Sequence, residues 1–177
     1  MHPESMELMG EFIKMCVKEN DTVLDVGSAM VNTGPRLMNL SYRTLLRNSN
    51  VEYTGLDIEA GRNVDLVVKD PYKWTEVKSD TYDIVISGQT LEHSEFFWLV
   101  FAEMARVLKP GGFMCLIVPK YHLTHRHPVD CWRFLPDGMK ALAKYVGIKC
   151  IKADASHIAD FLRPQRANLD CIGVFQK

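Results

Sequence analysis

The sequence has few features of a disulfide-stapled, membrane-spanning or nucleic-acid-binding protein. Its five cysteines are an odd number without a C-x-x-C pair, which excludes a disulfide framework and a four-cysteine zinc site. No apolar run approaches the ~18 residues of a bilayer span, and the first residues show no basic or apolar region of a signal peptide. Lys and Arg number 21 against 22 Asp and Glu, so no net field favours nucleic acid or an anionic membrane. We expect a cytoplasmic protein that binds neither a membrane nor nucleic acid.

The length and amino-acid composition of the chain are typical of one folded domain. The chain has 177 residues, of which 47% are hydrophobic and 24% charged, the balance of a globular protein. Because a domain typically has about 150 residues, we predict a single domain over residues 1–177.

Apolar residues alternate between helical and strand periodicity along the chain. The patterns predict helices over residues 3–17, 35–48, 97–108 and 136–146, and strands over residues 22–27, 51–58, 64–70, 82–87, 113–119, 148–153 and 170–175. Several of the strands are wholly apolar, which is typical of a mainly parallel sheet covered on both faces. The predicted fold class is therefore α/β.

The ends of the predicted strands carry the residues that could bind a ligand, because ligands of such sheets lie beyond the carboxyl ends of the strands. Gly27 follows the first strand and permits a tight turn close to a ligand. Asp57 ends the second strand, where it could accept hydrogen bonds from ribose hydroxyls, and Asp70 ends the third, where it could accept from an exocyclic amine. Together they indicate a nucleoside cofactor; the alternative is that both acids merely cap the helices that follow them.

These residues belong to an ordered series of motifs that resembles the class I S-adenosylmethionine-dependent methyltransferases of type 11. The series comprises Val23–Ser28, Gly55–Ile58, Tyr82–Ser87, Leu91–His93 and Ala105–Phe113. The resemblance covers about residues 6–152 and implies a Rossmann-like, doubly wound sheet of seven strands with the last strand antiparallel. It also implies S-adenosylmethionine as cofactor. A nicotinamide dehydrogenase fits less well, because no G-x-G-x-x-G follows the first predicted strand.

The resemblance further implies which residues hold the cofactor. Three groups would line its methionine end, hold the ribose and adenine, and close the floor of the site. They are Asp25, Gly27 and Ser28 for the methionine end; Asp57, Ile58, Asp70 and Pro71 for ribose and adenine; and Ser87, Gly88 and Gln89 for the floor.

The chain departs from the family in its first motif, which usually has a second glycine two residues after Gly27. Ala29 stands there instead, and Met30 and Val31 make the loop bulkier. Either the segment 32–34 (Asn32, Thr33, Gly34) supplies the missing contacts, or the cofactor binds weakly.

A polar loop after the fifth predicted strand is the second concentration of functional residue types. We expect it to form a wall of the acceptor site, with arginines for anionic groups and an aromatic ring for stacking. The substrate-binding candidates are Tyr121, Arg126, Trp132 and Arg133. The alternatives are a solvated loop or a His/Asp metal site; since the histidine spacing matches no helical i, i+4 pair of ligands, no metal is predicted.

Methyl transfer needs a proton acceptor when the acceptor atom is protonated at neutral pH. A histidine, with an ordinary pKa near ~6.5, suits that role. The catalytic candidates are His93, His122, His125 and His127, with Tyr121 or Asp130 as substitutes.

The expected function is transfer of a methyl group from S-adenosylmethionine to an oxygen or nitrogen of a small, sugar-containing or anionic metabolite. The alternative, motivated by the altered glycine loop, is a catalytically silent methyltransferase-like binding or scaffold protein. No separate cap domain is predicted, so a homo-oligomer that completes the site, or a bulky acceptor that covers it, would be needed to enclose a small molecule.

Overall fold

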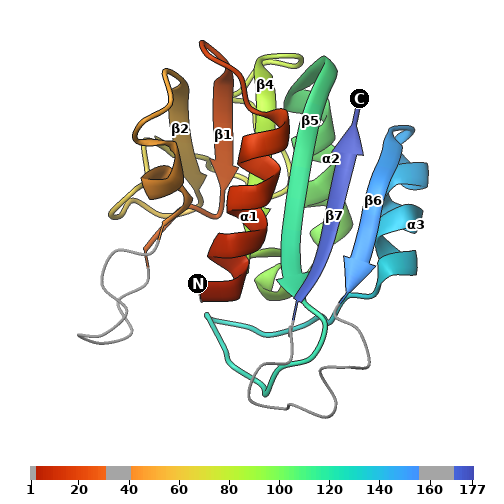
Figure 1. Ribbon diagram of the computed structural model, residues 1–177. Helices are drawn as coiled ribbons and strands as arrows, with labels where there is room; N and C mark the ends of the chain where they lie inside the picture. Colours follow the sequence, from red (N-terminus) through yellow and green to blue (C-terminus); the bar gives the residue numbers. More distant parts are fainter. Residues whose placement is uncertain (1–2, 31–40, 156–169) are drawn as a thin grey trace.

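A seven-stranded sheet with the strand order β3-β2-β1-β4-β5-β7-β6 forms the centre of the computed structural model, which describes residues 3–30, 41–155 and 170–177 (Figure 1). The strands are β1 (Thr22–Val26), β2 (Glu52–Asp57), β3 (Leu66–Val67), β4 (Tyr82–Gly88), β5 (Leu108–Pro119), β6 (Lys149–Ala155) and β7 (Asp170–Gln176). Strands β1 to β5 pair in parallel, and β7 pairs antiparallel with both β5 and β6. The Rossmann-like sheet with an antiparallel last strand is confirmed.

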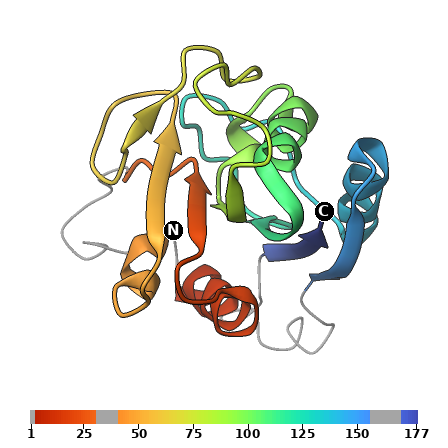
Figure 2. The ribbon, with the colours of Figure 1, turned by 90° about the horizontal axis from the view of Figure 1, so that it is seen from above.

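Helices cover both faces of the sheet, as predicted (Figure 2). They are α1 (Pro3–Cys16) and the 3-10 helix η1 (Tyr42–Leu46) on one face, and α2 (Phe97–Val107) and α3 (Pro136–Val146) on the other. Because side chains alternate across a strand, Val23 of β1 packs in the core under α1, while Leu24 packs in the core under α2. Among the described residues, no helix is long and apolar enough to cross a membrane.

The register of the central strands brings their carboxyl ends to one edge. Val26, the last residue of β1, pairs with Leu56 of β2 and with Ser87 of β4. The residues that follow, among them Gly27 and Asp57, therefore lie beside one another. The loop over residues 120–135 lies at the same edge, below the end of β5 in Figure 1.

Several predicted elements differ in extent from the structure. The third strand was predicted over 64–70 but spans only Leu66–Val67, because the carboxylate of Asp70 accepts from the backbone N–H of Tyr72 (2.8 Å) and turns the chain. The fifth strand begins at Leu108, which pairs with Tyr82, so the predicted helix 97–108 ends one residue early.

The helix predicted over 35–48 is, in its described part, the short 3-10 helix Tyr42–Leu46. The Ser41 hydroxyl accepts from the backbone N–H of Arg43 (3.2 Å) and so caps this helix at its start. Residues 35–40 lie outside the described part of the chain.

Two glycines provide a test of this packing. A Cβ on Gly55 would lie 2.0 Å from the carbonyl oxygen of Asn63, whereas a Cβ on Gly10, inside α1, would meet nothing within 4 Å. We expect Gly55→Ala to lower the free energy of unfolding by about 1–3 kcal/mol. Gly10→Ala should raise it by about 0.5–1 kcal/mol, since alanine is the better helix former. Urea unfolding of both variants measures this; equal stabilities would contradict the packing at Gly55.

Candidate active site

The loop that follows β1 forms the first part of the site. Gly27 has a φ of 76°, a conformation that favours glycine, and its N–H and that of Ser28 both donate to the carbonyl of Leu56 (2.9 and 3.1 Å). A Cβ on Gly27 would lie 2.1 Å from the hydroxyl oxygen of Thr90. This position therefore requires glycine, as the sequence indicated.

Asp57, at the end of β2, holds that loop from the neighbouring strand. One carboxylate oxygen accepts from the N–H of Ala29 and the other from the N–H of Ile58, both at 2.8 Å. Each oxygen retains a second lone pair, so the half-buried carboxylate can also accept from a ligand hydroxyl. The structure thus gives Ala29, where the family usually has glycine, a defined partner.

The rest of the loop packs on the connection between β2 and β3. Ser28 and Asn63 exchange two hydrogen bonds, from the Ser28 hydroxyl to the Asn63 carbonyl (3.0 Å) and from the Asn63 amide to the Ser28 carbonyl (2.9 Å). The N–H of Met30 donates to the carbonyl of Arg62 (3.1 Å). These bonds fix the loop as far as Met30; Val31 and the segment 32–34 lie outside the described residues.

Asp25 lies beneath the loop rather than at its surface. It is 3% exposed, and the Tyr53 hydroxyl donates to its carboxylate at 2.5 Å. Burial raises the pKa of Asp25 to about 7, although the Tyr53 hydrogen bond and the charge of Arg43 oppose the shift. The guanidinium of Arg43 stacks on the Tyr53 ring and pairs with Asp65. Asp25 is thus held in the core against Tyr53.

The residues expected near adenine lie on the surface beside Asp57. The Ile58 side chain is 53% exposed, which leaves an apolar face available to a flat ring. Asp70 is exposed and uses one oxygen for the turn at Tyr72. The carbonyl of Pro71 accepts from the indole of Trp74 (3.1 Å). Asp70 therefore stabilises a turn, since no helix follows it as the alternative interpretation required, and it still presents its carboxylate to solvent.

Ser87 and Gly88 end β4, and Gln89 follows them at the same edge of the sheet. The hydroxyl of the fully buried Ser87 donates to the carbonyl of Val26 (2.8 Å). A Cβ on Gly88 would lie 1.9 Å from the Tyr42 hydroxyl. Gln89 has a φ of 57°, and its amide donates to the carboxylate of Asp170 (3.0 Å). The side chains of Ser87 and Gln89 are thus engaged within the protein, and Gly88 leaves room for Tyr42.

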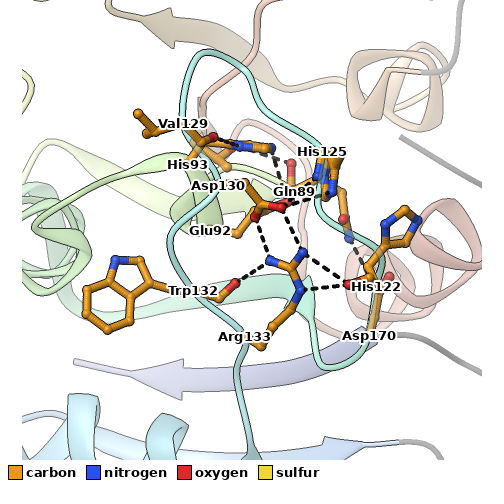
Figure 3. A network of polar contacts seen from close by, with 12 residues as sticks. Gln89, Glu92, His93, His122, His125, Val129, Asp130, Trp132, Arg133 and Asp170 are labelled. Atoms are coloured by element: carbon orange, nitrogen blue, oxygen red, sulfur yellow. Dashed lines mark hydrogen bonds and ion pairs between the residues drawn. The ribbon is translucent and has the colours of Figure 1, made fainter.

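The histidines come together at the other end of the same edge (Figure 3). Nδ1 of His93 lies 2.6 Å from the carbonyl oxygen of Val129; because a carbonyl only accepts, this nitrogen carries the proton and Nε2 has the lone pair. The rings of His125 and His127 meet the His93 ring edge-on, with centroids at 5.0 and 5.6 Å. The ring centroids of His122 and His125 are 4.7 Å apart. Burial lowers the pKa of His93 and favours its neutral form.

Glu92 belongs to this cluster, and sequence analysis did not single it out. Its side chain is fully buried, and neither carboxylate oxygen has a hydrogen-bond partner among the residues that the structure describes. Burial raises its pKa to about 8. Its backbone carbonyl accepts from the N–H groups of Cys131 (2.7 Å) and Trp132 (3.3 Å) and so holds the loop. The acid stands in the Leu91–His93 motif, but the motif does not reveal its burial.

Arg133, a predicted substrate-binding residue, is engaged inside the loop instead. Its guanidinium donates to both carboxylate oxygens of Asp130 (2.6 and 2.8 Å) and to the carbonyls of His122 and Leu123 (Figure 3). This bidentate pair holds the pKa of Asp130 well below its usual range. The Asp130 side chain is only 1% exposed and also accepts from the backbone N–H of His125 (2.7 Å).

The other predicted acceptor residues remain accessible. Tyr121 is 72% exposed and Arg126 is exposed. Trp132 is partly exposed; its indole N–H donates to the carbonyl of Ser94 (2.9 Å), and its ring packs against Phe97. The outer surface of the loop thus offers a cation and two aromatic rings.

Comparison with known proteins agrees with this geometry. A sequence model of the methyltransferase domain family matches residues 24–116, more than half of the chain. The chain belongs to this family. S-adenosylmethionine is therefore its cofactor, as the sequence motifs implied.

Solved structures share the fold at low sequence identity. A chain of the Haloferax volcanii complex between the methyltransferase activator Trm112 and a methyltransferase has a TM-score of 0.71 at 18% identity, covering 97% of this chain and 88% of that chain. The Burkholderia thailandensis 1,6-didemethyltoxoflavin-N1-methyltransferase, solved with its substrate and S-adenosylhomocysteine, has a TM-score of 0.70 at 13% identity, covering 98% and 78%.

A curated relative is much longer. The non-reducing polyketide synthase dpfgA of Gibberella zeae is 27% identical over 146 residues, which is 77% of this chain but only 6% of the synthase. This chain thus corresponds to a small part of that protein.

The residues present at the edge of the sheet fit the cofactor of the family. Asp57 offers a carboxylate with spare lone pairs beside the Gly27 turn, which suits the two hydroxyls of a ribose. Ile58 offers an exposed apolar face, and Asp70 an exposed acceptor.

The raised pKa of Asp25 predicts a pH-dependent stability. A carboxyl whose folded pKa is raised stabilises the fold most at low pH, and this contribution is lost as pH rises through its folded pKa, here about 7. Between pH 5 and pH 8 the protein should lose roughly 2–3 kcal/mol at this group. Asp25→Asn removes the titration, so it should gain stability relative to the natural protein over that range. Urea unfolding at both pH values measures the difference; parallel changes in both proteins would contradict the burial of the charge.

Proposed function

We propose that the protein transfers the methyl group of S-adenosylmethionine to an oxygen or nitrogen of a small, sugar-containing or anionic metabolite. The observation that carries the proposal is the shared edge of the sheet. Asp57 and the Gly27 turn stand at the ends of β2 and β1, and the loop with Arg126 and Tyr121 stands beyond the end of β5 (Figure 1). A donor and an acceptor held at these two places would meet over the end of β4.

The candidate cofactor-binding residues would each contact a different part of S-adenosylmethionine. Bound S-adenosylmethionine supplies a methyl group on a positively charged sulfur. Asp57 accepts from the ribose, Ile58 covers a face of adenine, and Asp70 with Pro71 meets the adenine edge. The backbone of the Gly27–Ser28 turn and of the segment 87–89 surrounds the methionine end, with Asp25 supporting it from below. Because the reaction removes charge from the sulfur, accurate positioning supplies much of the acceleration.

The acceptor side relies on the exposed surface of the loop. Arg126 is a donor for an anionic group, and Tyr121 and Trp132 are rings on which a sugar can stack. Arg133 positions the loop through Asp130 and therefore acts on the acceptor only indirectly. A second copy of the chain or a bulky acceptor would cover this open surface.

The four histidines remain the candidate proton acceptors for an alcohol or amine. All four lie in one cluster beside the exposed loop surface, and His93 presents an unprotonated Nε2 in its neutral form. We place the protein in the cytoplasm, because its five cysteines are free thiols and a reducing compartment preserves them.

Calorimetric titration with S-adenosylmethionine and with S-adenosylhomocysteine tests the proposal first. Binding of both, followed by transfer of a labelled methyl group to fractions of sugar-containing and anionic metabolites, is the expected result. A folded sample that binds neither compound would favour the silent binding protein. Binding without transfer to any sugar or anionic fraction would reject the acceptor class and leave the cofactor site intact.

Asp57→Ala tests the ribose contact. Loss of hydrogen bonds to a charged group should weaken cofactor binding by about 1.5–3 kcal/mol, or roughly 10- to 150-fold in Kd. Glu59→Ala removes the same charge from an exposed position two residues later and should leave Kd unchanged. Calorimetry on both folded variants gives the comparison. Equal affinities would show that Asp57 serves the loop alone.

Arg126→Ala tests the acceptor wall. The variant should keep its cofactor Kd but lose about 10- to 150-fold in kcat/KM for an anionic acceptor, as expected for one charged hydrogen bond. Arg47→Ala is the matched control, because Arg47 is exposed at the end of η1, before β2 begins and so at the opposite edge of the sheet. Activity within about twofold in both variants would make the loop a solvated connection.

A further inference from the structure

Three potential metal ligands come together after the end of β4. Glu92 and His93 come from the 3-10 helix η2 (Leu91–His93), and His125 comes from the loop over residues 120–135. One ligand atom of each side chain lies within 4.8 Å of the others. Residues more than thirty positions apart in the sequence therefore converge, as Figure 3 shows.

The Glu92 carboxylate needs a partner that the described part of the chain does not supply. Both of its oxygens are buried without a hydrogen bond, and a buried polar group without a partner costs free energy whether or not it is ionised. Nε2 of His93 lies 3.7 Å from one oxygen, beyond hydrogen-bond range. The nearby guanidinium of Arg133 is held by both oxygens of Asp130. A cation between Glu92 and the imidazoles would satisfy the carboxylate.

Both imidazoles have one ring nitrogen close to a backbone carbonyl. Nδ1 of His93 donates to the Val129 carbonyl (2.6 Å), and Nδ1 of His125 lies 3.1 Å from the Leu123 carbonyl. Each of these carbonyls fixes the proton on Nδ1 and leaves the lone pair on Nε2. A ligating histidine commonly has such a hydrogen bond from its other ring nitrogen.

We propose that Glu92, His93 and His125 bind one divalent transition-metal ion of the zinc and cobalt type. Two imidazoles and a carboxylate are a ligand set that such ions accept, and three protein ligands leave a position open for water or another ligand. Bonds of about 2.0–2.1 Å in tetrahedral geometry place ligand atoms about 3.3 Å apart. The side chains must therefore approach by no more than roughly 1.5 Å from their present separation.

The proposal reverses the expectation of no metal, for an identifiable reason. Sequence analysis weighed only histidines and acids within the loop, whereas two of the three ligands precede α2. Metal binding can be tested apart from the proposed function, since it needs neither cofactor nor acceptor. With His93 and His125 on a metal, His122 and His127 would remain as candidate bases.

Cobalt(II) titration of the purified, chelator-treated protein tests the site without any assay of activity. We expect one Co²⁺ per chain, with the visible absorption of a four- or five-coordinate ion, and its displacement by Zn²⁺. Glu92→Gln and His125→Ala should each weaken Co²⁺ binding at least tenfold. His122→Ala should bind as the natural protein does, because His122 is exposed and lies outside the three-ligand group.

Circular dichroism and urea unfolding, both measured in chelator, establish that each variant is folded. If Glu92→Gln fails to fold, His125→Ala decides the question, because His125 lies on a loop and its removal leaves the core intact. The proposal is overturned if Co²⁺ produces only the spectrum of the hydrated ion. It is equally overturned if the ligand variants and His122→Ala bind Co²⁺ with the same affinity.

Discussion

The pairing of β1 between β2 and β4 is the constraint on which both parts of the site depend. Because Val26 is in register with Leu56 and Ser87, three strands end together and their following residues share one edge. Hydrogen bonds beyond the strand ladders reinforce that register, including those from Gly27 and Ser28 to Leu56 and from the Ser87 hydroxyl to Val26. The functional residues thus stand on loops, but on loops that a buried sheet positions.

Four carboxyl groups at this edge differ in charge state and role because their surroundings differ. Asp25 is buried against a tyrosine hydroxyl, and burial raises its pKa to about 7. Asp57 is half-buried and accepts from two backbone N–H groups, with lone pairs to spare. Asp130 is buried but paired with Arg133, so its pKa falls. Glu92 is buried without a partner. Of the four, Asp57 and Glu92 can still gain a ligand.

The sequence was informative where local pattern decides structure. Apolar strands such as 82–87 and the helix 136–146 were placed correctly because their periodicity reflects burial on known faces. The third strand was overextended, since an edge strand with few pairing partners is limited by the turn at Asp70. Gly27 and Asp57 were found from their positions at strand ends.

Other site properties arise only from tertiary contact and could not be predicted. Arg133 was expected to face a substrate, but its carboxylate partner Asp130 lies three residues away in a loop whose shape the sequence does not specify. The burial of Glu92 results from the loop folding over η2, which is held by the bonds of Cys131 and Trp132 to its carbonyl. The hydrophobic periodicity of the sequence does not predict such a contact.

The segment that follows β4 connects the two halves of the site physically. Thr90 packs against Gly27 and directs its hydroxyl at the carbonyl of Gly88 (3.2 Å), so it defines the turn on the cofactor side. Two and three residues after Thr90, Glu92 and His93 belong to the histidine cluster. A ligand that draws these two side chains together would act on the same short 3-10 helix that Thr90 precedes. The Gly27 turn and the histidine cluster thus adjoin one short segment, in which Thr90 contacts the turn and His93 belongs to the cluster.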